Sequence, residues 1–244
     1  MAKNKPIQLV FDLDTDQKGN LWLATEKHGL LRYSIDSQDF IQIKNESYLG
    51  KNNLYINEIS QVYVDYDGII WANTDPYGID RIQFLPGNLS SFRIPFPENF
   101  PKELLNYSVR FMLKDETKNQ LILGTQQSGL WIINDKNLSI EKSFYNDEKH
   151  NPLPSNTIRF LKQDSSKNIW IGTSQGLAFL QNQTITKVNN PYGKDHSLSN
   201  FIRYIEDDKN DLLLGTEAGI YFLDKRKKNI KNKVVFLDKR ISFN

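Results

Sequence analysis

The stretch Asp164-Ser-Ser-Lys-Asn-Ile-Trp-Ile-Gly-Thr173, followed after two residues by Gly176-Leu177, recurs in related form along the 244-residue chain. It joins a polar turn headed by aspartate to a short β-branched and aromatic run that ends in threonine. Four further segments align with it: Asp16–Thr25, Asp65–Thr74, Asp115–Thr125 and Asp208–Thr216. The chain is therefore built from an internal repeat, and such a repeat indicates a repeat architecture.

The threonines that end the five segments set the repeat length. They are Thr25, Thr74, Thr125, Thr173 and Thr216, so successive copies lie 49, 51, 48 and 43 residues apart. Repeats of about 40 to 50 residues are typical of β-propeller blades. A helical repeat would need an apolar rhythm of 3.6 residues, and we find none. We predict an all-β chain: a β-propeller of about five four-stranded blades, either whole or an incomplete part of a larger propeller.

We expect residues 1–244 to form a single propeller domain. The repeats are predicted at approximately 7–46, 55–96, 105–147, 154–189 and 198–237. In the fourth repeat, strands are expected at 158–163 and 169–173, a third opens at Gly176, and a weaker fourth covers 184–188. Five repeats either close on themselves or leave apolar sheet faces that promote association.

Several recurring positions have a structural explanation. The aspartate can accept backbone hydrogen bonds within its turn. Residues suited to a left-handed turn follow it in four copies, whereas Lys167 departs from that pattern: Gly19, Gly68, Asn119 and Asn210. The central residue of the second strand is expected between adjacent sheets: Trp22, Trp71, Ile122, Trp170 and Leu213. Three glycines after it would leave room for a neighbouring backbone: Gly124, Gly172 and Gly215.

Composition narrows the function classes. With 39% hydrophobic and 25% charged residues, the chain has the composition of an ordinary globular protein. It has no cysteine, which excludes disulfides and thiolate metal sites, and a net charge of +2 gives no indication of nucleic acid. No apolar run approaches the roughly 20 residues of a membrane helix, and the N-terminus shows no signal peptide. No cofactor is predicted.

The pattern Asp-x-x-Gly-Asn-hydrophobic-Trp-hydrophobic-Gly-Thr-x-x-Gly-Leu resembles the two-component regulator propeller repeat. The nearest local match runs from Asn151-Pro-Leu-Pro-Ser-Asn through Thr173, and Ser197-Leu-Ser-Asn200 is a similar lead-in. The resemblance covers about residues 7–236. It implies a sensor propeller from the periplasmic half of a membrane-bound sensor kinase, with a small ligand, often an oligosaccharide, and the remaining kinase domains as partners. With five repeats, no membrane segment and no kinase domain, the chain fits a fragment of a longer sensor better than a stand-alone relative.

Three arginines are the main candidates for ligand binding. Arg110, Arg159 and Arg203 each follow the first apolar residue of a first strand, which in a propeller lines the central channel. Their bidentate donors suit a carboxylate or phosphate. The alternative is that each arginine pairs with a local acid or carbonyl, and the sequence favours this alternative.

The sequence supports other candidates for ligand binding, metal binding or catalysis less well. Trp131, outside the repeat position, is either a sugar-stacking platform or a core residue, with the core favoured. Asp12, Asp14, Asp16 and Gly19 have the wrong register for a calcium loop. The three histidines sit at unlike positions and indicate no catalytic or metal site: His28, His150 and His196.

The main hypothesis is a non-catalytic sensor or ligand-binding module. The rival is an enzyme, because some lyase propellers use a similar Asp-x-x-Gly-x-hydrophobic-Trp repeat. Repeated histidines and carboxylates at the starts of the first strands would favour the enzyme, and they are absent. A protein-interaction scaffold is the third interpretation, and sequence does not separate it from the first.

Overall fold

The structure is a computed structural model of the whole chain. It describes residues 9–45, 54, 56–74, 78–85, 88–93, 109–115, 117–137, 139–147, 152–190, 197–208 and 210–234. The chain divides into two compact units, residues 1–143 and 144–244, and each is described by itself.

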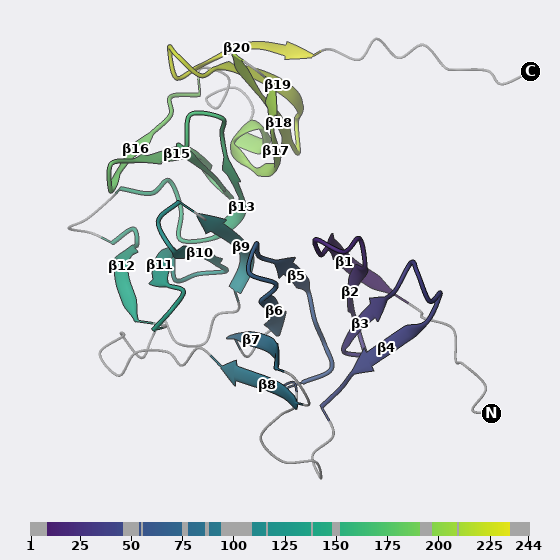
Figure 1. Ribbon diagram of the computed structural model, residues 1–244. Helices are drawn as coiled ribbons and strands as arrows, with labels where there is room; N and C mark the ends of the chain where they lie inside the picture. The colour runs from purple at the N-terminus through teal and green to yellow at the C-terminus, as the bar shows by residue number, and fades with distance from the viewer. Residues whose placement is uncertain are drawn as a thin grey trace, which may run out of the picture. The chain divides into compact units, whose positions relative to one another are not determined.

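The described residues of the first unit form three four-stranded sheets (Figure 1). The first sheet consists of β1 (Val10–Thr15), β2 (Leu21–Thr25), β3 (Leu30–Tyr33) and β4 (Phe40–Ile43). The second consists of β5 (Gln61–Val64), β6 (Ile70–Thr74), β7 (Gly78–Leu85) and β8 (Asn88–Arg93). The third consists of β9 (Val109–Asp115), β10 (Gln120–Thr125), β11 (Leu130–Asn134) and β12 (Ile140–Phe144), whose last residue already falls in the second unit.

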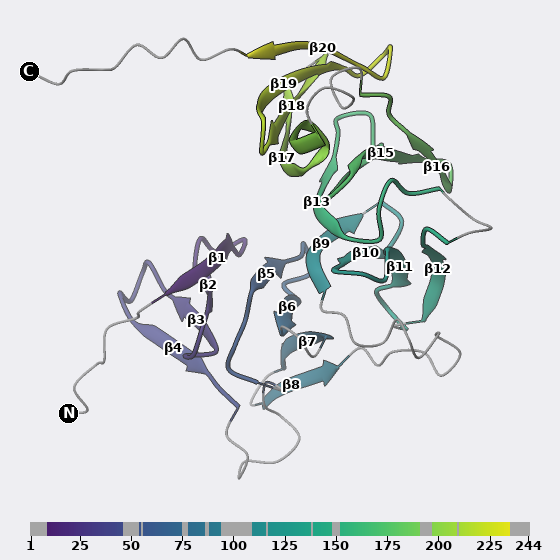
Figure 2. The same ribbon diagram turned by 180° about the vertical axis from the view of Figure 1, so that it is seen from behind.

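In the second unit, the part of the chain that the structure describes forms two four-stranded sheets (Figure 2). The fourth sheet consists of β13 (Ile158–Gln163), β14 (Ile169–Thr173), β15 (Gly176–Gln181) and β16 (Thr184–Lys187). The fifth consists of β17 (Ile202–Asp208), β18 (Asp211–Thr216), β19 (Gly219–Asp224) and β20 (Asn229–Val234), and the short 3₁₀ helix η2 (Ser197–Asn200) precedes it.

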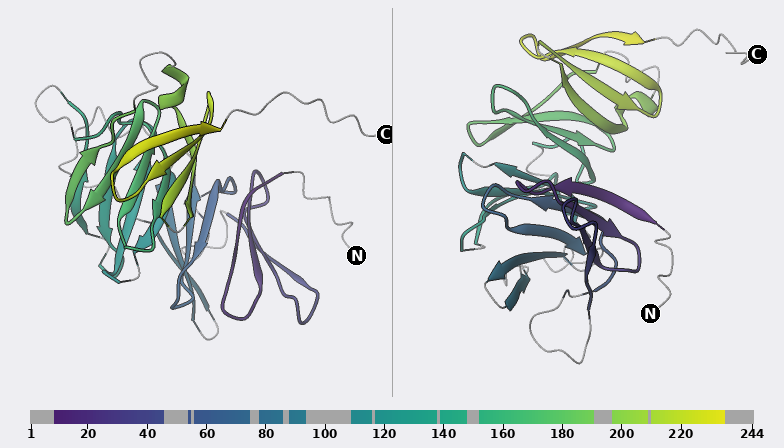
Figure 3. Two further views of the ribbon diagram at one scale, coloured as in Figure 1. Left: turned by 90° about the horizontal axis from the view of Figure 1, so that it is seen from above. Right: turned by 45° about the vertical axis from the view of Figure 1, so that its right-hand side comes forward.

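All five sheets are antiparallel meanders in which strands adjacent in sequence are adjacent in space (Figure 3). The predicted all-β architecture of five four-stranded sheets is confirmed. In the fourth repeat, every strand end that the sequence predicted lies within one residue of the corresponding end of β13 to β16. In the described part of the chain, no helix has the length and apolar character needed to cross a membrane.

The repeat tryptophan packs toward the sheet that follows it. Trp22 shares a core cluster with Ile59, Val62 and Val64 at the second sheet. Trp71 packs with Val109 and other residues of the third sheet. In the second unit, Trp170 packs with residues of the fifth sheet: Ile202, Ile205, Leu212, Leu214 and Tyr221.

Leu213 differs from the expectation for this position, because it is only half-buried. Leu212 and Leu214 face the fourth sheet and are fully buried. Successive side chains of a strand point to opposite faces, so Leu213 points away from the fourth sheet. Ile122, at the same position of the third sheet, is completely buried.

The aspartate turn is a hydrogen-bonded cap for the β-hairpin. Asp164 Oδ1 accepts the backbone amides of Ser166 and Asn168, both at 2.9 Å, as the sequence predicted. The sequence did not reveal that its other oxygen accepts the indole N–H of Trp170, at 2.8 Å. The same indole bond links Trp22 to Asp16, at 3.2 Å, and Trp71 to Asp65, at 3.0 Å.

Two structural expectations need correction. Lys167 has a φ of 65°, so it adopts the same left-handed conformation as Gly19 and Gly68, although its residue type departs from the pattern. Gly172 makes room for a side chain rather than a backbone: a Cβ there would lie 2.6 Å from Ile202 Cγ2.

The recurring threonine fastens the hairpin between the second and third strands. Thr173 Oγ1 donates to the carbonyl of Gly176, at 2.8 Å, and accepts the amide of Gln175, at 3.1 Å. Thr25, Thr125 and Thr216 donate to the equivalent glycine carbonyls at 2.7 to 2.9 Å. Thr74 is fully buried at the same place.

Candidate ligand-binding site at the strand bulges

Each of the three predicted arginines sits in a β-bulge. In the fourth sheet, Ile158 pairs with Thr173 and Phe160 with Gly172, so Arg159 has no partner in β14. The register shifts in the same way around Arg203 in β17 and around Arg110 in β9. A bulge re-aims the side chain of its extra residue, and bulges are common beside functional sites. The bulge therefore gives these three positions a common geometry.

In the second unit, two of the arginines meet at one aromatic ring. The guanidinium carbon of Arg159 lies 4.9 Å from the ring centroid of Phe201, and that of Arg203 lies 4.5 Å from it. Phe201 immediately precedes β17, whereas Arg159 comes from β13 of the neighbouring sheet. We call Arg159, Phe201, Arg203 and Glu217 the arginine cluster.

Within the cluster, Arg203 interacts with the neighbouring acid Glu217. Arg203 forms an ion pair with Glu217, whose backbone amide also donates to the carbonyl of Phe201 at 3.3 Å. The side chain of Arg203 is 51% exposed and that of Glu217 is 28% exposed, so the pair lies at the surface. The cluster contains two guanidinium groups and one carboxylate. A carboxylate matches the bidentate geometry of arginine.

Arg110 and Trp131 lie in the first unit. Arg110 is exposed at the start of β9. Trp131 is 2% exposed in the core of the third sheet, and its indole N–H donates to the carbonyl of Ser128 at 3.0 Å. A stacking platform needs an exposed ring face, and Trp131 does not present one in this structure.

The acidic residues near the N-terminus serve the packing of the first two sheets. Asp12 and Asp14 of β1 accept the backbone amides of Val62 and Val64, at 3.1 and 2.7 Å. Asp16 instead caps its own turn, where it accepts the amides of Lys18 and Asn20. Within the described ranges, no group of three or more His, Asp or Glu side chains could hold a metal ion.

His28 lies in the β2–β3 turn. Its backbone amide donates to Thr25 Oγ1, and its carbonyl accepts a hydrogen bond from the side chain of Gln42. His150 and His196 lie outside the described residues.

Sequence reasoning proposed the three arginines as a site but missed Phe201 and Glu217, which contact two of them. Phe201 stands directly before the Ile202-Arg203 pair, and Glu217 directly follows Thr216. An aromatic residue placed before a repeated apolar-arginine pair was the available signal for a shared cation–π site.

Comparisons with known proteins agree with this architecture. The family model described as the two-component regulator propeller matches residues 152–175, which include β13, β14 and the turn between them. This segment of the chain therefore matches one copy of the two-component regulator propeller repeat. The matched segment contains the bulge residue Arg159 and the hydrogen-bonded pair of Asp164 and Trp170.

One curated protein similar in sequence to this chain is histidine kinase P4 of Formosa agariphila. It is 24% identical over 245 residues, which cover 95% of this chain and 17% of the kinase. The chain therefore spans about a sixth of the length of that curated relative.

Solved structures show the fold. The extracellular domain of a putative hybrid two-component system of B. thetaiotaomicron superposes with a TM-score of 0.71 at 22% identity, covering 97% of this chain and 30% of that domain. Virginiamycin B lyase of Staphylococcus aureus superposes with a TM-score of 0.65 at 13% identity, covering 95% of this chain and 72% of the lyase. The fold is thus that of a β-propeller, as predicted, and the chain matches about a third of the larger sensor domain.

Proposed function

We propose that the chain is a non-catalytic, ligand-binding propeller segment of an extracytoplasmic sensor in a two-component signalling system. The propeller repeat and the similarity to sensor extracellular domains support the class of protein. The arginine cluster is the observation that supports ligand binding, because two bulged arginines from neighbouring sheets converge on Phe201. Kinase activity would reside in other domains of a longer protein.

The proposed ligand is an oligosaccharide that carries a carboxylate. Arginine binds a carboxylate through two parallel hydrogen bonds, and two arginines of the cluster lie at one aromatic ring. Arg203 is already engaged by Glu217, so the ligand carboxylate would compete with that ion pair or bind beside it. Surface ion pairs are weak, typically about 0 to 1 kcal/mol, so such competition is energetically accessible.

The test is calorimetric titration with matched acidic and neutral oligosaccharides. We expect acidic members to bind, and Arg159→Ala or Arg203→Ala to weaken binding by about 2 kcal/mol, roughly 30-fold, because a charge-assisted bidentate contact is lost. Arg110→Ala tests the third arginine in the first unit. Arg226→Ala is the control, because it removes an exposed arginine from the β19–β20 turn. Unchanged affinity in all three arginine variants would reject the arginine site.

A lyase-type enzyme is the second candidate, favoured by the structural similarity to virginiamycin B lyase. That similarity concerns the fold, at 13% identity. Incubation of the chain with each oligosaccharide that binds, followed by chromatography of the products, separates the two. An intact ligand supports the sensor, whereas catalytic release of an unsaturated product supports the enzyme. Binding of a protein partner with no response to any oligosaccharide would favour the scaffold.

A further inference from the structure

A cleft lies between the turn ends of the first and second sheets, both in the first unit. It has a volume of about 310 Å³, within the lower range of small-molecule sites. The first sheet contributes Trp22 and Arg32 to its wall, and the second contributes Val64, Tyr66 and Asp67. The arginine bulges lie at the opposite ends of their strands from the aspartate turns, so this cleft and the bulges occupy different ends of the repeat.

Hydrogen bonds between the two sheets fix the walls of the cleft. The carboxylates of Asp12 and Asp14 bind the backbone amides of Val62 and Val64 across the sheet interface. At the rim, Gln17 Nε2 donates to the carbonyl of Tyr66 at 2.5 Å and so ties the two turns together. A site on such preorganised elements loses little conformational entropy when a ligand binds.

Asp16, an acid in the lining of the cleft, accepts several hydrogen bonds from its own turn. Asp16 accepts the amides of Lys18 and Asn20, the side-chain amide of Asn20 and the indole N–H of Trp22. Burial raises the pKa of Asp16, but these hydrogen bonds outweigh burial and hold the pKa below its ordinary value. Asp16 is therefore ionised near neutral pH, and Asp67 is a second acid in the lining. These acids disfavour ligands with several negative charges more strongly than ligands with one.

Lys18 and Arg32 are the cationic residues of the cleft lining, and Arg32 has the planar paired donors that suit a carboxylate. It pairs with Trp22 across β2 and β3, and its Nε is buried without a hydrogen-bond acceptor. A buried donor with no acceptor costs free energy, more when it belongs to a charged group. Tyr66, at the rim, is 78% exposed and offers an aromatic face on which a ring can stack.

We propose that this cleft is a second binding site, for a small ring-bearing molecule with one carboxylate, in which Arg32 binds the carboxylate and Tyr66 stacks on the ring. Arginine and an exposed aromatic ring supply complementary contacts to the two ends of such a molecule. The ring can belong to a sugar acid or to an aromatic acid, since both present the same carboxylate and a stacking face.

The second sheet supplies a matched control for Arg32. Arg81 occupies the same register opposite Trp71, with its guanidinium 5.7 Å from the indole, and its Nε is likewise buried without an acceptor. Arg81 does not line the cleft. Both arginines therefore share the buried Nε, whereas Arg32 lines the cleft and Arg81 does not.

The experiment titrates the chain with two matched pairs of probes, glucuronate with glucose and benzoate with benzamide, followed by ligand-observed NMR. We expect at least one carboxylate to bind more tightly than its neutral partner; the pair that responds identifies the sugar acid or the aromatic acid. Arg32→Gln should weaken that binding by about tenfold or more, since a charged contact is lost. Tyr66→Ser, an exposed substitution, should also weaken it, whereas Arg81→Gln should not.

Equal weakening by Arg32→Gln and Arg81→Gln, equal affinity for acid and neutral probes, or binding of none of the four would overturn the proposal. Circular dichroism and the urea midpoint of each variant separate lost binding from lost folding, and Tyr66→Ser gives a result even if Arg32→Gln unfolds. Arg159→Ala and Arg203→Ala should leave this binding intact, so the outcome is independent of the arginine cluster.

Discussion

At the scale of single residues, the turn aspartate and the repeat tryptophan act as one unit. The indole bond occurs where the two residues are six positions apart, as in Asp164 and Trp170. In the third repeat, Ile122 stands in place of the tryptophan, seven positions after Asp115. The Oδ2 atom of Asp115 has no hydrogen-bond donor there, and the Nζ atom of Lys118 lies 3.3 Å from it. The six-residue spacing and the tryptophan are therefore coupled by a hydrogen bond as well as by packing.

This coupling predicts a graded response to substitution of Trp170, which is 1% exposed. Trp170→Ala should lower the free energy of unfolding by about 3 to 5 kcal/mol, because it leaves a large cavity. Trp170→Phe keeps most of the ring but removes the donor to Asp164, and should cost about 1 to 3 kcal/mol. Leu213→Ala, at the same repeat position but half-buried, should cost less than Trp170→Ala. Urea denaturation measures all three, and an equal cost for Trp170→Ala and Leu213→Ala would contradict the packing described.

At the scale of strands and sheets, small residues set how closely neighbouring sheets approach. A methyl group added at Gly172 of β14 would lie 2.6 Å from Ile202 Cγ2 and 3.3 Å from Ile205 Cδ1. Gly172→Ala should therefore destabilise the fold by about 1 to 3 kcal/mol through overpacking. Ile202→Ala should relieve the clash, so the double variant should lose less stability than the two single variants combined. Strict additivity of the two urea-derived losses would show that the sheets do not meet at this point.

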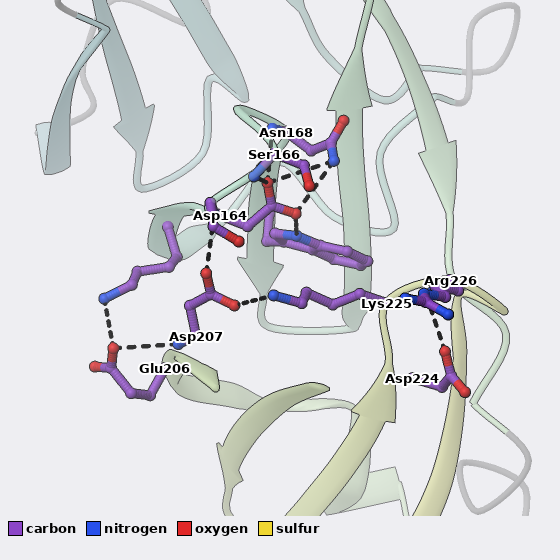
Figure 4. A network of polar contacts seen from close by, with 11 residues as sticks. Asp164, Ser166, Asn168, Glu206, Asp207, Asp224, Lys225 and Arg226 are labelled. Carbon is purple, nitrogen blue, oxygen red and sulfur yellow. Dashed lines mark hydrogen bonds and ion pairs between the residues drawn. The ribbon is translucent and has the colours of Figure 1, made fainter. Parts of the chain in front are cut away.

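A polar network also joins the fourth and fifth sheets, and Asp207 is at its centre (Figure 4). Asp207 of β17 accepts the amide of Ser165, at 2.9 Å, from the turn between β13 and β14. It also forms an ion pair with Lys225, which directly follows β19. Burial raises the pKa of Asp207, but the bonds from Lys225 and Ser165 outweigh it and place the pKa below its ordinary value.

The lowered pKa of Asp207 gives a prediction with a definite sign. A carboxyl group with a depressed pKa in the folded state stabilises the fold above its unfolded pKa of about 3.9 and loses this contribution as the pH falls through the folded pKa. Asp207→Asn should therefore destabilise the chain near neutral pH, and the difference from wild type should shrink as the pH is lowered below about 4. Urea midpoints across that range measure the difference. The exposed Asp36→Asn serves as control, and a difference that grows on acidification would show the sign to be wrong.

The strands were predictable from sequence, whereas the arginine cluster was predictable only in part. Turn residues and β-branched runs mark strand ends locally, which is why β13 and β14 agree with their predicted bounds. The bulge at Arg159 depends on how β13 pairs with β14, and the approach of Arg159 to Phe201 depends on a neighbouring sheet. The left-handed turn at Lys167 follows from the hairpin geometry despite an unfavourable residue type. These features arise from pairing between segments, which a local pattern does not contain.

At the scale of the whole molecule, the first sheet presents an apolar face. Asp14 and Trp22 are paired across β1 and β2 on the face that meets the second sheet. Leu13 pairs with the half-buried Leu23 on the opposite face and is 59% exposed. Phe40 pairs with Tyr33, which pairs with Leu21, so it lies on the same face as Leu13 and is 57% exposed. Contiguous apolar surface of this kind promotes association.

We therefore predict that the isolated chain self-associates through this face of the first sheet. Light scattering coupled to size exclusion, over a wide range of protein concentration, should show a mass that rises with concentration. Replacing Leu13 and Phe40 together by threonine should shift the chain toward monomer without a large loss of stability, because threonine keeps the strand propensity while it removes apolar surface. Tyr66→Ser is the control, since Tyr66 is the more exposed residue, at 78%, but lies on a turn outside this face. If the wild-type chain stays monomeric at every concentration, the exposed face does not drive association. If Tyr66→Ser disperses the chain as effectively as the double threonine variant, the contact lies at the cleft instead of the first sheet.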